Sequence, residues 1–234
     1  MTSFNDRHVV VTGGTGALGA AVLDALLQAG ATCLVPYRSQ RSVESSPHRG
    51  NARVSFVEVG DLADESSVTR FYEGLNALWA SIHLAGGFAA APIAHSDKAQ
   101  LMGQLEANLV SAYLCSRAAA MALRRLGSSG RIVNVASRQA IENRLGSGTV
   151  AYTIAKAGVA ALTTALGAEL AKEDILVNAV APSIMDTPDN RKAMPAADFA
   201  SWPKVEEVAA AILWLASPAN KVTRGAVVPV YGRA

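Results

Sequence analysis

Apolar residues along the chain fall into short runs that alternate with longer stretches at helical spacing. The short runs predict seven strands, at residues 8–12, 32–35, 54–59, 81–84, 131–136, 176–180 and 226–230. The longer stretches predict helices over 17–29, 66–79, much of 96–126, 150–171 and 204–216, the last behind a helix-initiating Pro203. Because parallel strands are joined by crossover helices, this rhythm predicts an α/β fold of Rossmann type. We expect a doubly wound, mainly parallel sheet with helices on both faces.

The sequence shows no linker rich in Pro, Gly or Ser and no internal repeat, so residues 1–234 are expected to form a single dinucleotide-binding and catalytic domain. Half of the residues are hydrophobic and 17% are charged, which supplies a large core and excludes a disordered chain. The net charge of +2 argues against a partner that is nucleic acid or a membrane surface. No apolar run reaches the roughly 18 residues of a membrane span, and the N-terminus does not resemble a signal peptide.

The two cysteines, Cys33 and Cys115, lie outside any redox or metal-binding motif. We interpret them as buried thiols in a reducing compartment rather than as a disulfide or metal ligands. This interpretation favours a cytoplasmic location and predicts no metal site.

Ligands of such sheets bind beyond the carboxyl ends of the strands, and a glycine-rich turn follows the first predicted strand. This turn reads Thr-Gly-Gly-Thr-Gly-Ala-Leu-Gly from residue 12 to residue 19. Glycines let the backbone approach a pyrophosphate, and the following helix offers free N–H groups to the phosphates. The position between strand and helix favours a nucleotide site over a merely tight turn. The residues expected to bind the dinucleotide are Gly13, Thr15, Gly16, Ala17, Leu18 and Gly19.

The end of the second predicted strand indicates which nicotinamide nucleotide is bound. An acidic residue there would bind the ribose hydroxyls of NAD, but this chain has Tyr37 and Arg38. A guanidinium suits a 2′-phosphate, so the sequence favours NADP, with NAD possible if Arg38 is simply solvated. Asp61 and Leu62 follow the third strand. Asp61 would accept a hydrogen bond from adenine or cap the next helix, although Asp64 is better placed for the cap.

Small residues, Ala85 and Gly86, follow the fourth predicted strand and would let the backbone lie against the cofactor. His83, inside that strand, is interpreted as a packed or hydrogen-bonded histidine. Several apolar side chains would form a pocket wall or simply pack in the core: Phe88, Met185, Met194, Phe199 and Trp202.

Four polar residues are candidates for catalysis: Asn108, Ser137, Tyr152 and Lys156. Tyr152 and Lys156 are four residues apart and therefore share one face of a helix. Hydride transfer between a carbonyl and an alcohol needs a proton donor at the oxygen, and free tyrosine, with a pKa of about 10, serves poorly at neutral pH. A lysine ammonium one turn away favours the phenolate. Ser137 would hold the substrate oxygen, and Asn108 would hold a water that relays protons to Lys156.

The chain resembles the short-chain dehydrogenase/reductase family over nearly its full length. The residues that carry this resemblance are the turn at 12–19, Asp61, Ala85-Gly86, Asn108, Ser137, Tyr152, Lys156, and the segment from Pro182 to Thr187. The resemblance implies that Tyr152 is the acid–base residue, that Lys156 binds the nicotinamide ribose and lowers the pKa of Tyr152, and that Ser137 orients the substrate. It implies a supporting role for Asn108 in the proton relay.

The same resemblance implies cofactor contacts for Pro182 and Thr187, a substrate-covering segment at 188–202 and a homo-tetramer or homo-dimer. Three residues depart from the family pattern: Ala17 replaces the second glycine of the turn, Leu84 an asparagine, and Ser183 a glycine. Ser137 and Tyr152 are fifteen residues apart (152 − 137), about two more than in many members. The glycine turn and Ala-Gly-Gly-Phe also resemble the dihydropteridine reductase branch, which lacks the serine.

The sequence therefore predicts an oxidoreductase that acts on a small carbonyl or alcohol with NADP or NAD. Two alternatives from other classes are a nucleotide-sensing regulatory protein and a scaffold subunit that binds the cofactor without turnover. The regulatory alternative predicts a damaged Ser/Tyr/Lys set, whereas all three residues are present. Leu84 and the long spacing leave room for the scaffold alternative.

Overall fold

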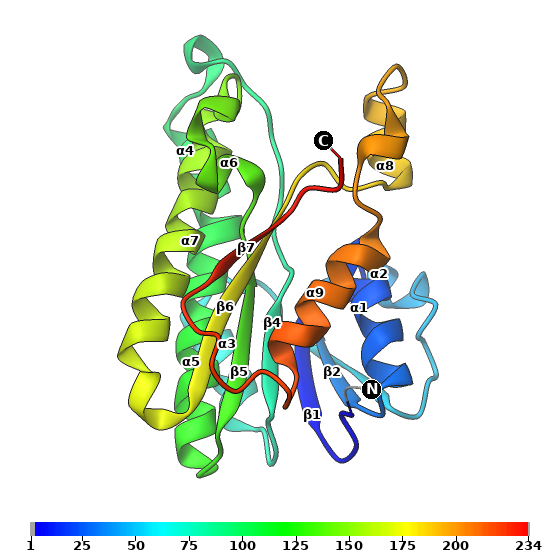
Figure 1. Cartoon of the computed structure of the whole chain (residues 1–234), viewed down its shortest axis with the longest axis vertical. Coiled ribbons are helices and arrows are strands. Elements are labelled where there is room, and N and C mark those ends of the chain that lie inside the picture. Colours follow the sequence, from blue (N-terminus) through cyan, green and yellow to red (C-terminus); the bar gives the residue numbers. More distant parts are fainter. Residues whose placement is uncertain (1–2, 234) are drawn as a thin grey trace.

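The computed structural model describes residues 3–233, and its centre is one seven-stranded parallel sheet (Figure 1). The spatial order is β3-β2-β1-β4-β5-β6-β7, so the direction of strand addition reverses between β1 and β4. Such a reversal opens a crevice at the carboxyl ends of the strands, where ligands bind. The strands are β1 (His8–Thr12), β2 (Thr32–Tyr37), β3 (Val54–Glu58), β4 (Ala80–His83), β5 (Gly130–Val135), β6 (Ile175–Pro182) and β7 (Val227–Val230).

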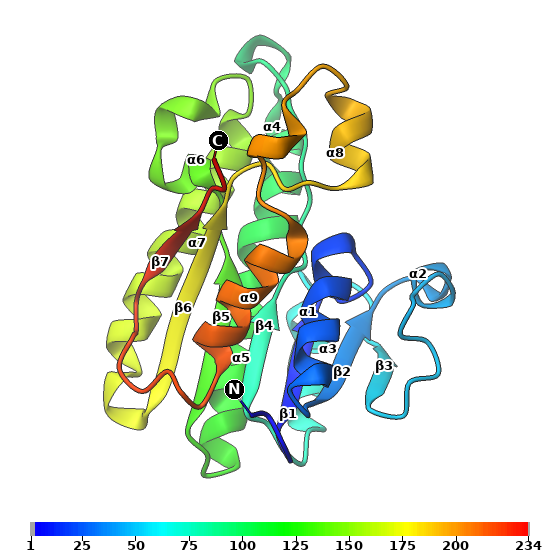
Figure 2. The same ribbon diagram turned by 45° about the vertical axis from the view of Figure 1, so that its right-hand side comes forward.

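Helices cover both faces of the sheet (Figures 1 and 2). Helices α1 (Ala17–Gln28) and α9 (Val205–Ala216) pack together on one face, and α3 (Glu65–Glu73), α5 (Ser111–Arg125) and α7 (Val150–Glu169) lie on the other. Successive side chains of β1 point to opposite faces of the sheet and pack under different helices. Val9 and Val11 enter the apolar cluster beneath α1 and α9, and Val10 enters the cluster beneath α3 and α5.

Shorter elements connect this framework. They are α2 (Gln40–Glu44), α4 (Lys98–Gln104), α6 (Arg138–Ile141), α8 (Pro188–Ala193), a π-helical segment η2 (Leu105–Val110), and the 3₁₀ turns η1 (Ile93–His95), η3 (Asn143–Gly146), η4 (Ala171–Glu173) and η5 (Phe199–Ser201). The predicted fold class and the predicted strands are confirmed. The long helix expected within 96–126 is present as α4, η2 and α5, with its middle turn in the π form.

Two predicted helix boundaries are wrong. The helix expected at 66–79 ends at Glu73, because Gly74 follows and the chain then turns to bury Leu75 and Leu78. Pro203 does not begin the last helix. Helix α9 begins at Val205 with Lys204 as its N-cap, and the Glu207 side chain accepts a hydrogen bond from the Lys204 N–H at 2.7 Å.

Helix α7 combines length with apolar composition. Within residues 3–233 it alone is long and apolar enough to cross a membrane, with 20 residues and a mean hydropathy of 1.3. Tyr152, Lys156 and several threonines interrupt its apolar run, and 33% of its most apolar window is buried. One face of α7 packs on β6, and this face carries the candidate catalytic residues.

Candidate active site

The turn between β1 and α1 places backbone where side chains would not fit. Gly13 has a φ of +67°, and a Cβ there would lie 2.7 Å from the Ala85 nitrogen. A Cβ on Gly19 would overlap the Gly13 oxygen and would lie 2.6 Å from the Gly14 Cα. This packing holds the first turn of α1 against the glycine loop. The unpaired N–H groups of α1 are therefore presented at the carboxyl end of β1.

A cavity of about 450 Å³ lies beside this turn. Nine of the predicted cofactor residues line it: Gly13, Thr15, Gly16, Tyr37, Arg38, Asp61, Leu62, Ala85 and Gly86. Seven residues that were not predicted as cofactor contacts also line it: Pro36, Ser39, Ser42, Gly60, Leu84, Ala107 and Ser111. The other seven predicted cofactor residues do not line this cavity: Ala17, Leu18, Gly19, Tyr152, Lys156, Pro182 and Thr187. A cleft beside a glycine turn and a helix N-terminus fits a dinucleotide.

The far end of the cavity carries an exposed ion pair. Arg38 Nη1 lies 3.9 Å from Asp61 Oδ2, and the two side chains are 76% and 63% exposed. Such a pair is weak and can open to admit an anionic group. Asp64, not Asp61, caps α3, because its carboxylate accepts the Ser66 N–H at 3.1 Å. Asp61 is therefore free of the capping role that the sequence left open.

The candidate catalytic residues come together where β5 and α7 meet. Lys156 Nζ donates to the Val135 carbonyl at 2.8 Å and lies 5.9 Å from the centroid of the Tyr152 ring. A Cβ on Gly86 would lie 3.6 Å from Lys156 Nζ, so the ammonium adjoins the cavity wall. Among the described residues, the buried Ser137 Oγ makes no hydrogen bond of good geometry, although it lies close enough to the Tyr152 hydroxyl to influence the pKa of that phenol. A buried polar atom left in this state is a candidate for binding a ligand.

Burial sets the protonation states of Tyr152 and Lys156. It raises the pKa of the Tyr152 phenol, an effect that the neighbouring Ser137 hydroxyl opposes. Burial lowers the pKa of Lys156 to about 8. At neutral pH the phenol is therefore protonated and the ammonium is mostly charged. Both shifts follow from removing charged forms from water, as at many reactive sites.

Asn108 lies in the π-helical segment and holds the loop after β4. Its Oδ1 accepts from the Gly87 N–H at 3.2 Å, and its Nδ2 donates to the carbonyls of Gly87 at 2.9 Å and Gln104 at 3.1 Å. The Thr12 hydroxyl accepts the Ala85 N–H at 3.2 Å on the other side of this loop. Thr12 and Gly87 belong to the two turns that the sequence indicated, but it did not indicate that Thr12 and Asn108 would hold the loop after β4 through its backbone groups.

A buried chain of hydrogen bonds runs beneath the site from α3 to α7. Asn134 Nδ2 donates to Thr163 Oγ1 at 3.1 Å, so Asn134 Oδ1 accepts from His83 Nδ1 at 2.8 Å. His83 Nε2 therefore accepts from Ser81 at 2.8 Å, and Ser81 accepts from Tyr72 at 2.7 Å. Burial lowers the pKa of His83 to about 4, which agrees with this neutral state. The prediction that His83 is a hydrogen-bonded histidine is confirmed.

The loop after β6 continues into the segment at 188–202, which contains α8 and η5 (Figure 1). Thr187 caps α8 by accepting the Asn190 N–H at 3.2 Å, and Arg191 pairs with Asp186 at 2.6 Å. Ser183, which replaces the glycine of the family pattern, donates to the Tyr231 carbonyl at 2.8 Å. This bond ties the loop after β6 to the chain beyond β7.

Residues 3–233 contain no cluster of three or more His, Cys, Asp or Glu side chains that could hold a metal ion. The arrangement instead combines a nucleotide cleft with an adjoining tyrosine, lysine and serine. Such a set can move a proton at the oxygen of a bound carbonyl or alcohol.

Comparison with known proteins finds relatives over most of the chain. The profile of the short chain dehydrogenase family matches residues 7–198. Galactitol 2-dehydrogenase of Rhizobium johnstonii is 34% identical over 240 residues, which cover 96% of this chain and 93% of that protein. A short-chain type dehydrogenase/reductase from Mycobacterium ulcerans is similar in structure with a TM-score of 0.88, at 25% identity and with 99% and 90% of the two chains covered. ElxO with NADP bound shares the fold with a TM-score of 0.86, at 22% identity and with 99% and 98% covered.

Proposed function

Because the chain belongs to the short-chain dehydrogenase family and is an NAD(P)-dependent oxidoreductase, we propose that it transfers a hydride between NADP(H) and a carbonyl or alcohol substrate. The observation that carries the proposal is the convergence of Tyr152, Lys156 and Ser137 beside the nucleotide cavity. The relative from Rhizobium johnstonii is named for the oxidation of a sugar alcohol, which supports the reaction class.

A nicotinamide held beside Lys156 and Tyr152 would supply the hydride for reduction or accept it in oxidation. Tyr152 donates its phenolic proton to the carbonyl oxygen during reduction and takes it back during oxidation. Because burial raises its pKa, the phenol holds the proton until the substrate oxygen gains charge. Lys156 then stabilises the phenolate that remains.

Ser137 and Lys156 have distinct positioning roles in this proposal. The Ser137 hydroxyl donates to the substrate oxygen and fixes it near Tyr152. Lys156 uses one N–H for the Val135 carbonyl, and its other two would be available to a ribose hydroxyl of the cofactor and to a water molecule. Asn108 acts through the backbone of Gly87, because its amide is occupied there on both sides.

The preference for NADP is proposed from the far end of the cavity. Arg38 is exposed at the cavity wall, where Ser39 offers a hydroxyl group, whereas the Ser42 hydroxyl already donates to the Ser39 carbonyl at 2.6 Å. A 2′-phosphate would displace Asp61 from Arg38 and gain a guanidinium partner. Pro182 and Thr187 would contact the nicotinamide end of the cofactor, and the segment at 188–202 would cover the substrate.

Two measurements test the proposal. NADPH and NADH are titrated separately against the protein, and we expect tighter binding of NADPH, with a preference that Arg38→Ala removes. A panel of carbonyls is then assayed with Tyr152→Phe, which should lower kcat by at least about a hundredfold and leave the Kd of NADPH unchanged. Tyr113→Phe, an exposed tyrosine on α5, is the matched control. Retained turnover in Tyr152→Phe would refute the mechanism, and binding without turnover would favour a regulatory or scaffold protein.

We further propose a homo-dimer or homo-tetramer in the cytoplasm. The outer surfaces of α5 and α7 expose Met121 and Ile154, each about half accessible, which suits an interface between copies. Cys33 and Cys115 are unpaired and buried, which suits a reducing compartment. Light scattering of the purified protein tests the assembly, and a monomer at micromolar concentration would refute it.

A further inference from the structure

The rim of the proposed catalytic site is unusually rich in exposed apolar side chains. Residues 88–94, Phe-Ala-Ala-Ala-Pro-Ile-Ala, form an apolar loop between β4 and α4, and most of this loop is exposed. Phe88 is 64% exposed and Ile93 is 72% exposed. Exposed large apolar groups also follow β5 and β6, at Leu145 and Ile184. Because β4, β5 and β6 are neighbours in the sheet, these side chains all follow its carboxyl edge, where exposed apolar groups are candidates for binding a ligand.

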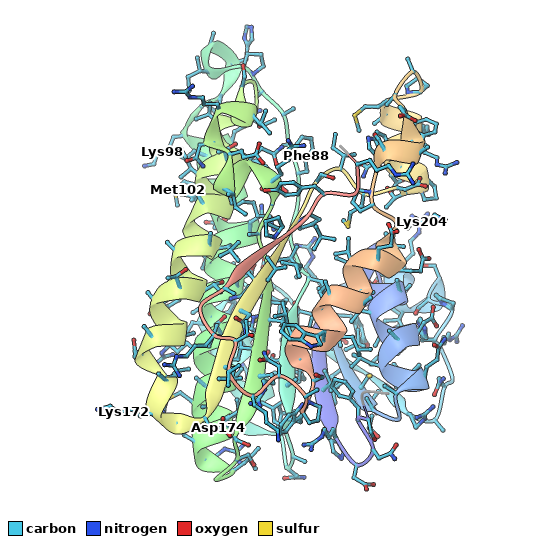
Figure 3. All side chains as sticks on the ribbon, viewed as in Figure 1. Phe88, Lys98, Met102, Lys172, Asp174 and Lys204 are labelled. Carbon is cyan, nitrogen blue, oxygen red and sulfur yellow. The ribbon has the colours of Figure 1, made fainter. Side chains whose placement is uncertain are left out.

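Phe88 connects this rim to the proposed acid–base residue. Its ring meets the Tyr152 ring edge-to-face, with centroids 5.0 Å apart and planes at 80°. In Figure 3, Phe88 lies beyond the carboxyl ends of the strands, at the end of the molecule that carries α6 and α8 in Figure 1. Because the two rings are in contact, the Phe88 ring is available to the atoms next to a substrate oxygen at the Tyr152 hydroxyl.

Two arginines near the rim are already paired with carboxylates. Arg138, directly after Ser137, binds Glu142 through two bonds of 3.1 and 3.3 Å and stacks on Tyr231 at 4.7 Å. Arg191 is held by Asp186 in the same two-bond manner. A substrate carboxylate would have to break one of these pairs to gain an arginine. Arg138 and Arg191 are therefore less available to an anionic substrate than the exposed apolar side chains are to a hydrocarbon group.

We infer that Phe88 is a specificity-determining residue, and that the substrate is a carbonyl or alcohol whose carbon next to the reacting centre carries an apolar alkyl or ring group. The inference rests on the proposed function and names its substrate class. A polyhydroxylated chain would place hydroxyl groups against the Phe88 ring without partners, which costs binding. A hydrocarbon group instead removes exposed ring surface from water.

The test compares three ketones with NADPH: cyclohexanone, tetrahydropyran-4-one, which differs by one ring oxygen, and dihydroxyacetone. We expect kcat/KM to be highest for cyclohexanone and at least about tenfold lower for dihydroxyacetone. Phe88→Ala should lower kcat/KM for cyclohexanone by about tenfold or more, chiefly through KM, with little change for dihydroxyacetone. Phe88→Leu should restore most of the loss, and Val222→Ala, an exposed apolar residue ahead of β7, should behave as wild type.

Several outcomes would overturn the inference. A higher kcat/KM for dihydroxyacetone than for cyclohexanone would do so. An equal loss of kcat/KM for all three ketones in Phe88→Ala would also do so, because Phe88 would then only support the position of Tyr152. If Phe88→Ala changes the oligomeric state but not the preference among ketones, the rim forms contacts between copies of the chain instead.

If no ketone is reduced, the proposed function fails, and the thermal shift of the NADP⁺ complex decides the inference separately. Stabilisation by cyclohexanone, absent with dihydroxyacetone and lost in Phe88→Ala, would support it, and equal or absent stabilisation would refute it.

Discussion

The neutral histidine beneath the site makes folding stability depend on acid in a calculable way. His83 is 4% exposed, and burial lowers its pKa to about 4, whereas a histidine in the unfolded chain has a pKa of about 6.5. Between these values the unfolded chain binds a proton that the folded protein does not. Stability from this residue is therefore complete above about pH 6.5 and is lost as the pH falls towards 4.

The size of the effect follows from the difference in pKa. At pH 5 the unfolded chain gains about 1.5 × 1.36, or roughly 2 kcal/mol, relative to pH 7. A change of about 2 kcal/mol is a large part of the 5–15 kcal/mol typical of a domain. For a chain of this length it should lower Tm by about 4–8 °C.

Urea unfolding at pH 7 and pH 5 measures the effect against a matched variant. His83→Gln keeps one N–H for Asn134 and one acceptor for Ser81 but cannot be protonated at these pH values. Carboxylates with lowered pKa values also lose stability in acid, so the informative quantity is the difference between wild type and variant. We expect wild type to lose about 2 kcal/mol more than His83→Gln. His95→Gln, at an exposed histidine, should lose as much as wild type, and equal losses in all three proteins would refute the reasoning.

Two further predictions concern the cofactor turn and the buried lysine. Gly19→Ala should abolish NADPH binding in a fluorescence titration, because its Cβ would overlap the Gly13 backbone. Gly103→Ala on α4, where nothing lies within 4 Å of the added Cβ, should bind NADPH within about threefold of wild type, and equal effects of the two substitutions would contradict this argument. Lys156→Met should abolish turnover yet raise the free energy of unfolding at pH 7 by about 1–3 kcal/mol, because burying the ammonium costs stability below its folded pKa of about 8. That gain should shrink as the pH rises towards 10.5, and a destabilised variant at pH 7 would contradict the reasoning.

Sequence periodicity predicted the sheet well, because parallel strands buried on both faces appear as uninterrupted apolar runs. The ends of helices were harder to predict. Leu75 and Leu78 continue the helical spacing of α3, but they are buried from a turn after Gly74. Pro203 looked like a first helical residue, whereas the Glu207 carboxylate fixes the start of α9 two residues later.

The residues of the nucleotide cleft were largely predictable because each follows a strand. Roles that depend on backbone contacts were not predictable, as Asn108 shows. Its amide holds Gly87, and no pattern in the sequence indicates which carbonyl an asparagine will reach. The chain from Tyr72 to Thr163 was equally hidden, because it joins residues that are distant in sequence and meet only when β4 and β5 pair.

The π-helical segment at Leu105–Val110 has a consequence for the geometry of the long helix. A π turn accommodates one residue more than an α turn, so it shifts the angular phase of everything after it by about 100°. Helix α5 thereby presents a different set of positions to the sheet than a straight continuation of α4 would present. Deleting one residue from this segment would leave the composition almost unchanged and still rotate fifteen downstream residues about the helix axis. A sequence alignment in this region should therefore match α4 and α5 separately, because the helical register of α4 does not continue into α5.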